Sequence, residues 1–372
     1  MKVASFNMEN IFFRDERLIK RNVSNCLSSW MTEFENLMSR ESRHQKNYVR
    51  LRELSFLLGF NQSALEPYVI LRRKAGQLYM RRRTSELEIK AHAATGWNGW
   101  IKLCSRPIDE IAVRNKARLI SEVNPDVLIV QEVEDRQSLL DFNEIYLPEE
   151  VRFSNVYVLG GNDSMGRELG ILTKSSVNIS CAKNYADKVT ANGQNLFELD
   201  FQEFNLVDAK GDPILVMSAC MAEKEIGSEK ADLHRKLQAE AIAMIYEKRR
   251  GEGFKKIIVA GTFNVPSYCA TLSPLLQGTD LKEIKKHKSF NVDFDNGKDA
   301  GYYSLGAYRK GVNTKQQDYL LLSPALFERV ENSGLNRKGI FPGKKDQFHS
   351  FPTVMSEQTQ ASSHPLTWFK TG

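Results

Sequence analysis

The sequence has few cysteines and no long apolar run. Its five cysteines are scattered through 372 residues without CxxC spacing. This excludes a disulfide-rich scaffold and predicts free thiols in a reducing, cytoplasmic compartment. No uninterrupted stretch of about 18 apolar residues occurs, so we expect no transmembrane helix and no membrane partner. The first residues, MKVASFNMENIFF, lack the charged and long apolar regions of a signal peptide and predict a strand instead.

The chain also lacks a strong bias in charge or composition. Its formal net charge is +6 and its pI is about 8.9, a modest excess that permits a polyanionic partner without requiring one. Hydrophobic residues make up 41% and charged residues 26%, which is ordinary for a globular domain. These values exclude a disordered or collagen-like chain.

Residues 14–107 differ in character from the rest of the chain. Arg, Leu, Glu, Lys and Ala recur there at helical spacing, which predicts helices over 47–60 and 85–94 and hence a helical insertion after the first strand. Two basic clusters, at 72–74 and 81–83, are either solvated helix faces or phosphate contacts. The tryptophans of the GWNGW segment at 96–100 are interpreted as packing residues or as base-stacking residues.

From residue 108 onward, apolar strands and amphipathic helices alternate, which predicts an α/β fold. We expect helices at 111–123 and 230–249, single strands at 126–130, 256–260, 318–323 and 365–369, and paired strands at 156–159 with 169–173 and at 205–209 with 214–218.

Polar residues stand at the tips of these apolar strands. They are Asn7, Glu132, Asn264, Asp318 and His364. Taken singly, each is better explained as a cap or a turn residue. Together they predict a site at one edge of a sheet, where side chains on rigid elements converge.

Six motifs occur in a fixed order along the chain: SFNMENIF at 5–12, DVLIVQEVEDRQSL at 126–139, GNDSMGRELGILTK at 161–174, GTFNVP at 261–266, QQDYLLLSP at 316–324 and ASSH at 361–364. As an ordered set they resemble the endonuclease/exonuclease/phosphatase superfamily, the DNase-I-like metal phosphodiesterases. The resemblance implies one domain over residues 1–372, with 14–107 inserted in it. It also implies a four-layer α/β sandwich, in which two packed mixed sheets are flanked by helices. Without the insertion about 280 residues remain, a plausible size for one domain.

The resemblance also implies roles for individual residues. In the family, a glutamate with an acidic neighbour holds Mg²⁺, which neutralises charge on the phosphate, and the remaining groups position water and substrate. Carried onto this sequence, the expected metal ligands are Glu132 and Glu9, the phosphate-binding residues are Asn7, Asn162 and Arg167, and the catalytic residues are Asn264, Asp318 and His364. Arg167 lies two residues beyond the position of the family's arginine. His349 is an alternative match for the terminal histidine, and we prefer His364 because it directly precedes the last strand.

Three positions depart from the family pattern. Thr262 replaces the water-positioning aspartate of GDxN, Ser363 replaces the aspartate of SDH, and Cys220 replaces a phosphate-binding histidine. Threonine and serine are uncharged at neutral pH and cysteine is mostly a thiol, so none supplies the charge of the group it replaces. Each such loss costs on the order of 10²–10⁴ in rate, and efficient hydrolysis by the family mechanism is not expected.

Two functions from different classes follow. The first is a weak or inactive member that binds nucleic acid or another phosphate ligand, or that serves as a partner subunit of another protein. The second is an active nuclease or phosphodiesterase with a rearranged site, dependent on Mg²⁺ or Mn²⁺, in which Glu168, Asp163 or Asp346 supplies the missing acid. The first needs no metal. A zinc site on Cys220 and His364 is a third, lesser alternative.

Overall fold

The structure is a computed structural model of the whole chain. It describes residues 1–14, 23–38, 40, 43–57, 69–71, 79–81, 87–89, 101–103, 106–163, 167–197, 199–221, 229–292, 316–343 and 348–372. The chain divides into two compact units. The larger contains Met1–Phe12, Ile108–Asp163 and Arg167–Gly372, and the smaller is centred on Phe13–Pro107.

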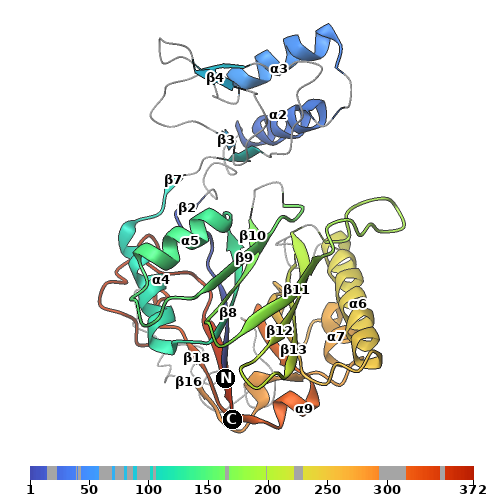
Figure 1. Cartoon of the computed structure of the whole chain (residues 1–372). Coiled ribbons are helices and arrows are strands. Elements are labelled where there is room, and N and C mark those ends of the chain that lie inside the picture. The colour runs from blue at the N-terminus through green and yellow to red at the C-terminus, as the bar shows by residue number, and fades with distance from the viewer. Residues whose placement is uncertain are drawn as a thin grey trace. The chain divides into compact units, whose positions relative to one another are not determined.

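Two mixed sheets form the larger unit (Figure 1). Within the described residues, the first has seven strands in the order β16 (Phe290–Val292), β18 (Val330–Asn336), β19 (Leu366–Thr371), β1 (Lys2–Asn7), β8 (Val127–Val133), β10 (Glu168–Thr173) and β9 (Asn155–Leu159). The second has six, in the order β11 (Asn178–Asn184), β12 (Asp200–Val207), β13 (Pro213–Cys220), β14 (Ile257–Thr262), β17 (Asp318–Leu322) and β15 (Lys282–Glu283).

Helices cover the outer faces of both sheets, which makes four layers. The helices of this unit are α4 (Glu110–Val123), α5 (Arg136–Ile145), α6 (Glu229–Gly251), α7 (Ser273–Leu276) and α9 (Pro324–Phe327). Along β8, Leu128 and Val130 pack in the core that α4 and α5 share, while Val127 and Ile129 pack between the two sheets. The residues of β14 divide in the same way, with α6 covering their outer face. This confirms the predicted four-layer α/β sandwich.

The strands and helices predicted after residue 108 are also present. The 156–159 and 169–173 segments pair as β9 and β10, and 205–209 and 214–218 belong to the antiparallel pair β12 and β13. Helix α4 begins where the Asp109 side chain accepts a hydrogen bond from the Ile111 amide, and it ends at Asn124 in a left-handed conformation. These caps explain why the helix boundaries were readable from the sequence.

The smaller unit is only partly helical. Helices α2 (Val23–Met38) and α3 (Gln45–Leu57) are joined by the ion pair of Arg50 with Glu33 at 2.7 Å, and α3 contains most of the helix predicted at 47–60. The same unit contains the paired strands β2 (Phe13–Arg14) with β7 (Arg106–Pro107), β3 (Val69–Leu71) with β6 (Ile101–Leu103), and β4 (Tyr79–Arg81) with β5 (Leu87–Ile89).

The helix predicted over 85–94 was therefore wrong, because β5 pairs with β4 in that stretch. A few apolar residues between charged ones fit the period of a helix as well as that of a strand, so the sequence pattern alone does not distinguish the two. Here the pairing of β5 with β4 makes this stretch a strand. The basic cluster at 72–74, most of the cluster at 81–83 and both tryptophans of GWNGW lie outside the described residues. Within the described part of the chain, no helix is long and apolar enough to cross a membrane.

Candidate functional site

One edge of the two sheets collects strand ends from distant parts of the chain. Strands β1 and β8 run parallel, as do β13 and β14, so each pair ends at a common edge. The antiparallel strands β10, β17 and β19 begin at that edge. In the six-stranded sheet, Cys220, Thr262 and Asp318 stand in one row across β13, β14 and β17. The topology thus brings the predicted residues together.

A bulge in β8 turns Glu132 toward this site. The pairing with β10 shifts by one residue between Glu168 and Gly170, and Glu132 has a φ of 56°. Strict alternation would place the Glu132 side chain beside Val130, under the outer helices. The extra residue and the left-handed backbone instead direct the carboxylate inward, as bulges next to functional sites commonly do.

Left-handed backbone is concentrated around this edge. Among the described non-glycine residues, Glu9, Asn10, Glu132 and Asn264 have positive φ there, with Asn124 at the helix cap as the remaining case. Such conformations are costly for residues with a Cβ and persist where the surroundings enforce them. The backbone at these strand ends is therefore held in conformations that the surrounding structure enforces.

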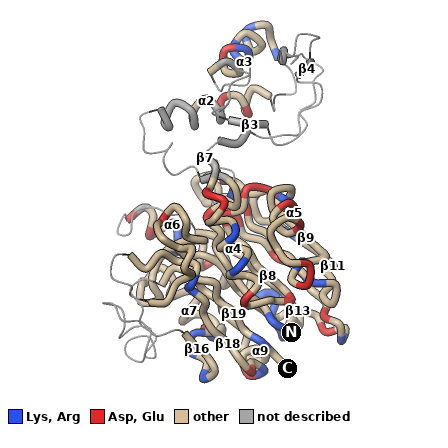
Figure 2. Tube along the Cα trace, turned by 90° about the vertical axis from the view of Figure 1, so that its left-hand side faces the viewer, with Lys and Arg blue, Asp and Glu red and all other residues tan. Residues whose placement is uncertain are grey.

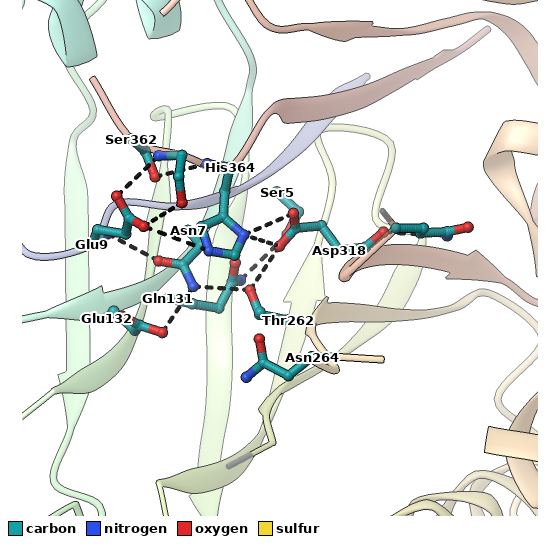
Figure 3. A network of polar contacts seen from close by, with 12 residues as sticks. Ser5, Asn7, Glu9, Gln131, Glu132, Thr262, Asn264, Asp318, Ser362 and His364 are labelled. Atoms are coloured by element: carbon teal, nitrogen blue, oxygen red, sulfur yellow. Dashed lines mark hydrogen bonds and ion pairs between the residues drawn. The ribbon is translucent and has the colours of Figure 1, made fainter. Parts of the chain in front are cut away.

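The side chain of Asn7 joins the two sheets (Figure 3). Its amide nitrogen donates to Glu132 Oε1 at 3.0 Å and to Thr262 Oγ1 at 3.0 Å. The Thr262 hydroxyl in turn donates to Asp318 Oδ1 at 2.8 Å. Thr262 is fully buried and both of its hydrogen-bonding roles are used. It is thus a neutral bridge between Asn7 and Asp318.

His364 continues the network on the far side of Asp318. Its Nδ1 donates to Asp318 Oδ2 at 2.9 Å, and its Nε2 lies 3.8 Å from Glu9 Oε1. Burial lowers the pKa of His364, but the charge of Asp318, their hydrogen bond and the charges of Glu9 and Glu132 together raise this pKa to about 10. His364 is therefore an imidazolium at neutral pH.

Ser363 faces Glu9 rather than His364. The backbone amide of Ser363 donates to Glu9 Oε2 at 2.9 Å, and its hydroxyl donates to Glu9 Oε1. The loop that holds Glu9 is anchored by Glu134, a buried carboxylate that accepts from the amides of Ile11 and Phe12. Hydrogen bonds between Ser363 and Glu9 thus join the loop before β19 to the loop after β1.

Arg167 is a second cation, partly buried, on the opposite side of Glu132. Its Nε donates to Asp163 Oδ2 at 2.9 Å, and its Nη1 lies 3.6 Å from Glu132 Oε2. The Cys220 thiol lies 3.7 Å from the other oxygen of Glu132. Both oxygens of the Glu132 carboxylate therefore have close polar neighbours within the protein.

The remaining candidates lie outside this network. The amide of Asn162 donates to the carbonyls of Ala186 and Phe197, and the amide of Asn264 donates to the carbonyl of Met221, so both hold loops in place. Asn264 directly follows the strand that carries Thr262 and lies beside it in Figure 3. Glu168 accepts from the amide of Gly161 at 2.7 Å. The alternative histidine, His349, is exposed, and Asp346 is outside the described residues.

The residues present do not fit the divalent cation that the family resemblance implies. Mg²⁺ is held by one or two carboxylates and neutralises negative charge. Here Glu132 faces the guanidinium of Arg167, Glu9 is bound to Ser363, and Asp318 is bound to His364. Within the described part of the chain, no three His, Cys, Asp or Glu side chains converge at metal-ligand spacing, which also leaves the zinc hypothesis without support.

Two supporting residues were not predicted from the sequence. Glu134 lies two residues after Glu132. The second glutamate of the QEVED segment is the sequence signal that could have identified it. Lys116 is fully buried on α4 and donates to the carbonyl of Ala361, which fixes the start of the loop that carries His364. A lysine on the expected outer face of an amphipathic helix gave no such signal.

Comparison with known proteins finds similarity at the level of structure. No model of a protein family matches the sequence, and no curated protein matches it. Among solved structures, a mannosyl-6-phosphatase of Bacteroides thetaiotaomicron is similar at 16% identity and a TM-score of 0.46, over 70% of this chain and 91% of its own.

Two further solved structures are similar over comparable lengths. An endonuclease/exonuclease/phosphatase family protein of Bacteroides thetaiotaomicron is 15% identical, with a TM-score of 0.46, over 70% of this chain and 88% of its own. The catalytic domain of human Nocturnin with bound sulfate is 10% identical, with a TM-score of 0.47, over 71% and 87%. At these identities the similarity assigns neither an activity nor a substrate.

Proposed function

We propose that this chain is an endonuclease/exonuclease/phosphatase-type protein that binds a phosphate ester, nucleic acid included, and hydrolyses it weakly or not at all. The observation that carries the proposal is the hydroxyl of Thr262 between Asn7 and Asp318. A hydroxyl in this position cannot take a proton from water as a carboxylate does, because its own proton is donated to Asp318 and its oxygen accepts from Asn7.

The charges around Glu132 support the same proposal. In-line attack on a phosphodiester depends on positioning and on electrostatic stabilisation of the developing charge. The guanidinium of Arg167 already lies beside Glu132, and Cys220 adds no charge where the family has a cation. The remaining polar groups are hydrogen-bonded or ion-paired with one another, which leaves them poorly placed to orient a water molecule for attack.

A phosphate would contact the two cations of the site, the buried His364 and the partly buried Arg167. Asp318 orients the first and Asp163 orients the second. The network also contains the carboxylates of Glu9 and Glu132, so carboxylates outnumber cations and phosphate binding is expected to be weak. Removing the charge of either Glu9 or Glu132 should strengthen phosphate binding.

The surface charges favour a compact phosphate ester over a long polymer. Figure 2 shows basic and acidic positions interspersed along the described chain in that view. Nucleic-acid interfaces usually present a continuous basic stripe. We therefore take a phosphate monoester or diester as the ligand class, and test single-stranded DNA and RNA beside it.

An active hydrolase with a rearranged site is the second candidate. It is favoured by the His364–Asp318 pair and by the inward-facing Glu132, since both are groups that the family chemistry uses. In that case a divalent cation would have to displace Arg167 from Glu132. Free thiols at Cys181, Cys220 and Cys269 support the cytoplasmic location expected for either function.

The deciding experiment compares the natural chain with Glu132→Gln, using plasmid DNA, RNA and a chromogenic phosphodiester in Mg²⁺ or Mn²⁺, with phosphate-ester binding followed in parallel by calorimetry. Our proposal predicts at most weak cleavage, which Glu132→Gln leaves unchanged, and about threefold to tenfold tighter binding by Glu132→Gln, because one repulsive charge is gone. Metal-dependent cleavage that Glu132→Gln abolishes would establish the second candidate instead.

A reciprocal experiment restores the family residues. The triple variant Thr262→Asp, Ser363→Asp and Cys220→His returns two carboxylates and one imidazole to a backbone that already has the required shape. Metal-dependent cleavage by the triple variant alone would support loss of activity by side-chain replacement. The matched control carries Thr262→Asn, Ser363→Asn and Cys220→Gln, and it should show no metal-dependent cleavage.

A further inference from the structure

An exposed apolar stripe runs along helix α6, away from the site. Leu233, Leu237 and Met244 are exposed to 61%, 37% and 69%, and the half-buried Ala241 lies between the last two. Their spacing of three to four residues places them on one face of the helix. Large apolar side chains are seldom left in water in such a row, so the stripe marks a contact surface.

The opposite face of the same helix accounts for the folding of α6. Ala239, Ile242 and Tyr246 are buried there against the six-stranded sheet. Leu233, Leu237 and Met244 do not belong to this core, although Ala241 packs against it. The two leucines and the methionine of the stripe therefore require an explanation outside the folded chain.

We propose that the stripe pairs with the same stripe of a second copy of this chain, with the two α6 helices antiparallel. If Leu233 lies opposite Met244 of the second copy, Leu237 meets Glu240 and Ala241 of that copy, and the small alanine leaves room for the leucine. Two-fold symmetry repeats each contact, as in the isologous interfaces of most dimers.

Charge supports this register. Glu229 then lies opposite Lys248 of the second copy, at each end of the pair, and both side chains are exposed. Near the centre, Lys236 approaches Glu240 of the second copy, which extends the 4.0 Å ion pair that these residues make within one helix. The helix has Glu229 and Asp232 in its first turn and Lys248, Arg249 and Arg250 in its last, so its two ends attract each other in antiparallel pairing.

The contact is small, because it uses one face of one helix. Interfaces below about 1,200 Å² are typically weak or transient. We therefore expect a dissociation constant on the order of 10⁻⁵ M, and hence a dimer that appears as protein concentration rises. This pairing is independent of the phosphate-binding proposal, since α6 contributes no residue to the network of Asn7 and Asp318.

Cysteine cross-linking tests the register. In a Cys181→Ser background, Leu233→Cys with Met244→Cys should give an intermolecular disulfide on mild oxidation. Either single variant should not, because in this register the two identical positions lie about 16 Å apart along the helix axis. Cross-linking of a single variant as strong as that of the pair, or no cross-linking of the pair, would overturn the proposed register.

Charge reversal tests the pairing without cysteines. Glu229→Lys and Lys248→Glu should each weaken the dimer about threefold to tenfold in sedimentation, since each puts like charges together twice. A mixture of the two variants should recover the natural affinity, because every contact then joins opposite charges. If the natural chain stays monomeric at several hundred micromolar, or if the mixture remains as weak as its parts, the second copy is not what covers this stripe.

Discussion

The two sheets contribute unequally to the candidate site. The seven-stranded sheet supplies Asn7 and Glu132, which are the residue types that the family resemblance implies. The six-stranded sheet supplies Cys220 and Thr262, where charged groups are expected, and keeps only Asp318. Both sheets nevertheless hold their strand ends in special conformations, with Glu132 at a φ of 56° and Gly261 at 147°.

This difference between the two sheets shows that backbone conformation and side-chain charge at the site can change independently. A bulge or a left-handed turn is maintained by packing and hydrogen bonds around it, so it persists when a neighbouring side chain changes. Charge at the site resides in single side chains and is lost by single substitutions. The strand ends of both sheets thus keep unusual backbone conformations, whereas the residue types that the family resemblance implies are found chiefly in the seven-stranded sheet.

The largest effect is expected from the backbone of the six-stranded sheet. A Cβ at Gly261 would lie 1.7 Å from the Ala219 carbonyl oxygen, in a backbone conformation that favours glycine. Gly261→Ala should destabilise the fold by more than about 4 kcal/mol, measured by chemical denaturation. Gly160→Ala, with nothing within 4 Å of the added Cβ, is the control and should change stability little. Equal stability of the two variants would disprove the idea that the backbone of β14 at Gly261 is rigid.

The next effect concerns pH and the pair of His364 with Asp318. The folded protein holds the pKa of His364 at about 10, above its ordinary value of 6.5, so the folded state binds the proton more tightly than the unfolded state. This stability is fully present below pH 6.5 and is lost as pH rises through 10. Denaturation from pH 6 to pH 10 should therefore show a progressive loss.

Asp318→Asn is the matched control for that measurement. Without the carboxylate, the raised pKa should fall, the pH-dependent difference from the natural chain should disappear above pH 10, and stability near pH 7 should drop by about 2–4 kcal/mol. Following the His364 ring by NMR gives the pKa directly. A histidine that titrates near 6.5 in the natural chain would refute the assignment of an imidazolium.

A smaller effect is expected at Thr262. Thr262→Val keeps the shape of the side chain but removes the hydroxyl that bridges Asn7 and Asp318. We expect a loss of about 1–3 kcal/mol, because the buried Asn7 and the partly buried Asp318 each lose a hydrogen-bond partner. Thr262→Ser keeps the hydroxyl and should recover most of the loss. Identical stability of the valine and serine variants would show that the bridge does not link the two sheets energetically.

The smallest effect belongs to Ser363, which is exposed. Ser363→Ala removes one hydrogen bond to Glu9 and leaves the one from the backbone amide. We expect less than about 1 kcal/mol in thermal denaturation, with phosphate binding nearly unchanged. A loss as large as that at Thr262 would mean that the exposed end of the network matters as much as its buried centre.

Much of the larger unit was predictable because its strands have clear patterns. Strands β8 and β14 are apolar runs buried on both faces, and turn residues mark the β12–β13 hairpin. The strands of the smaller unit were missed because three-residue pairings such as β4 with β5 leave little periodicity. The Glu132 bulge was also unpredictable, since alternation along β8 points that side chain outward.

At the candidate site too, local sequence motifs predicted some features, whereas contacts between distant parts of the chain were not predictable. Motif order identified Glu132, Asp318 and His364, which the structure brings into one network. It did not reveal that Ser363 faces Glu9, or that Thr262 contacts Asn7 from the opposite sheet. These contacts join residues more than 250 positions apart, and only the packing of the two sheets decides them.

The placement of β1 has a consequence for how the chain folds during synthesis. The first strand pairs on one side with β8 and on the other with β19, where Lys2 stands opposite Lys370. The ribosome must therefore synthesise and release more than 360 further residues before β1 gains β19 as its second neighbour. Until then, the backbone hydrogen-bonding groups along one edge of β1 remain unpaired and can pair with other strands. Folding in the cell should therefore be slow and sensitive to chaperones.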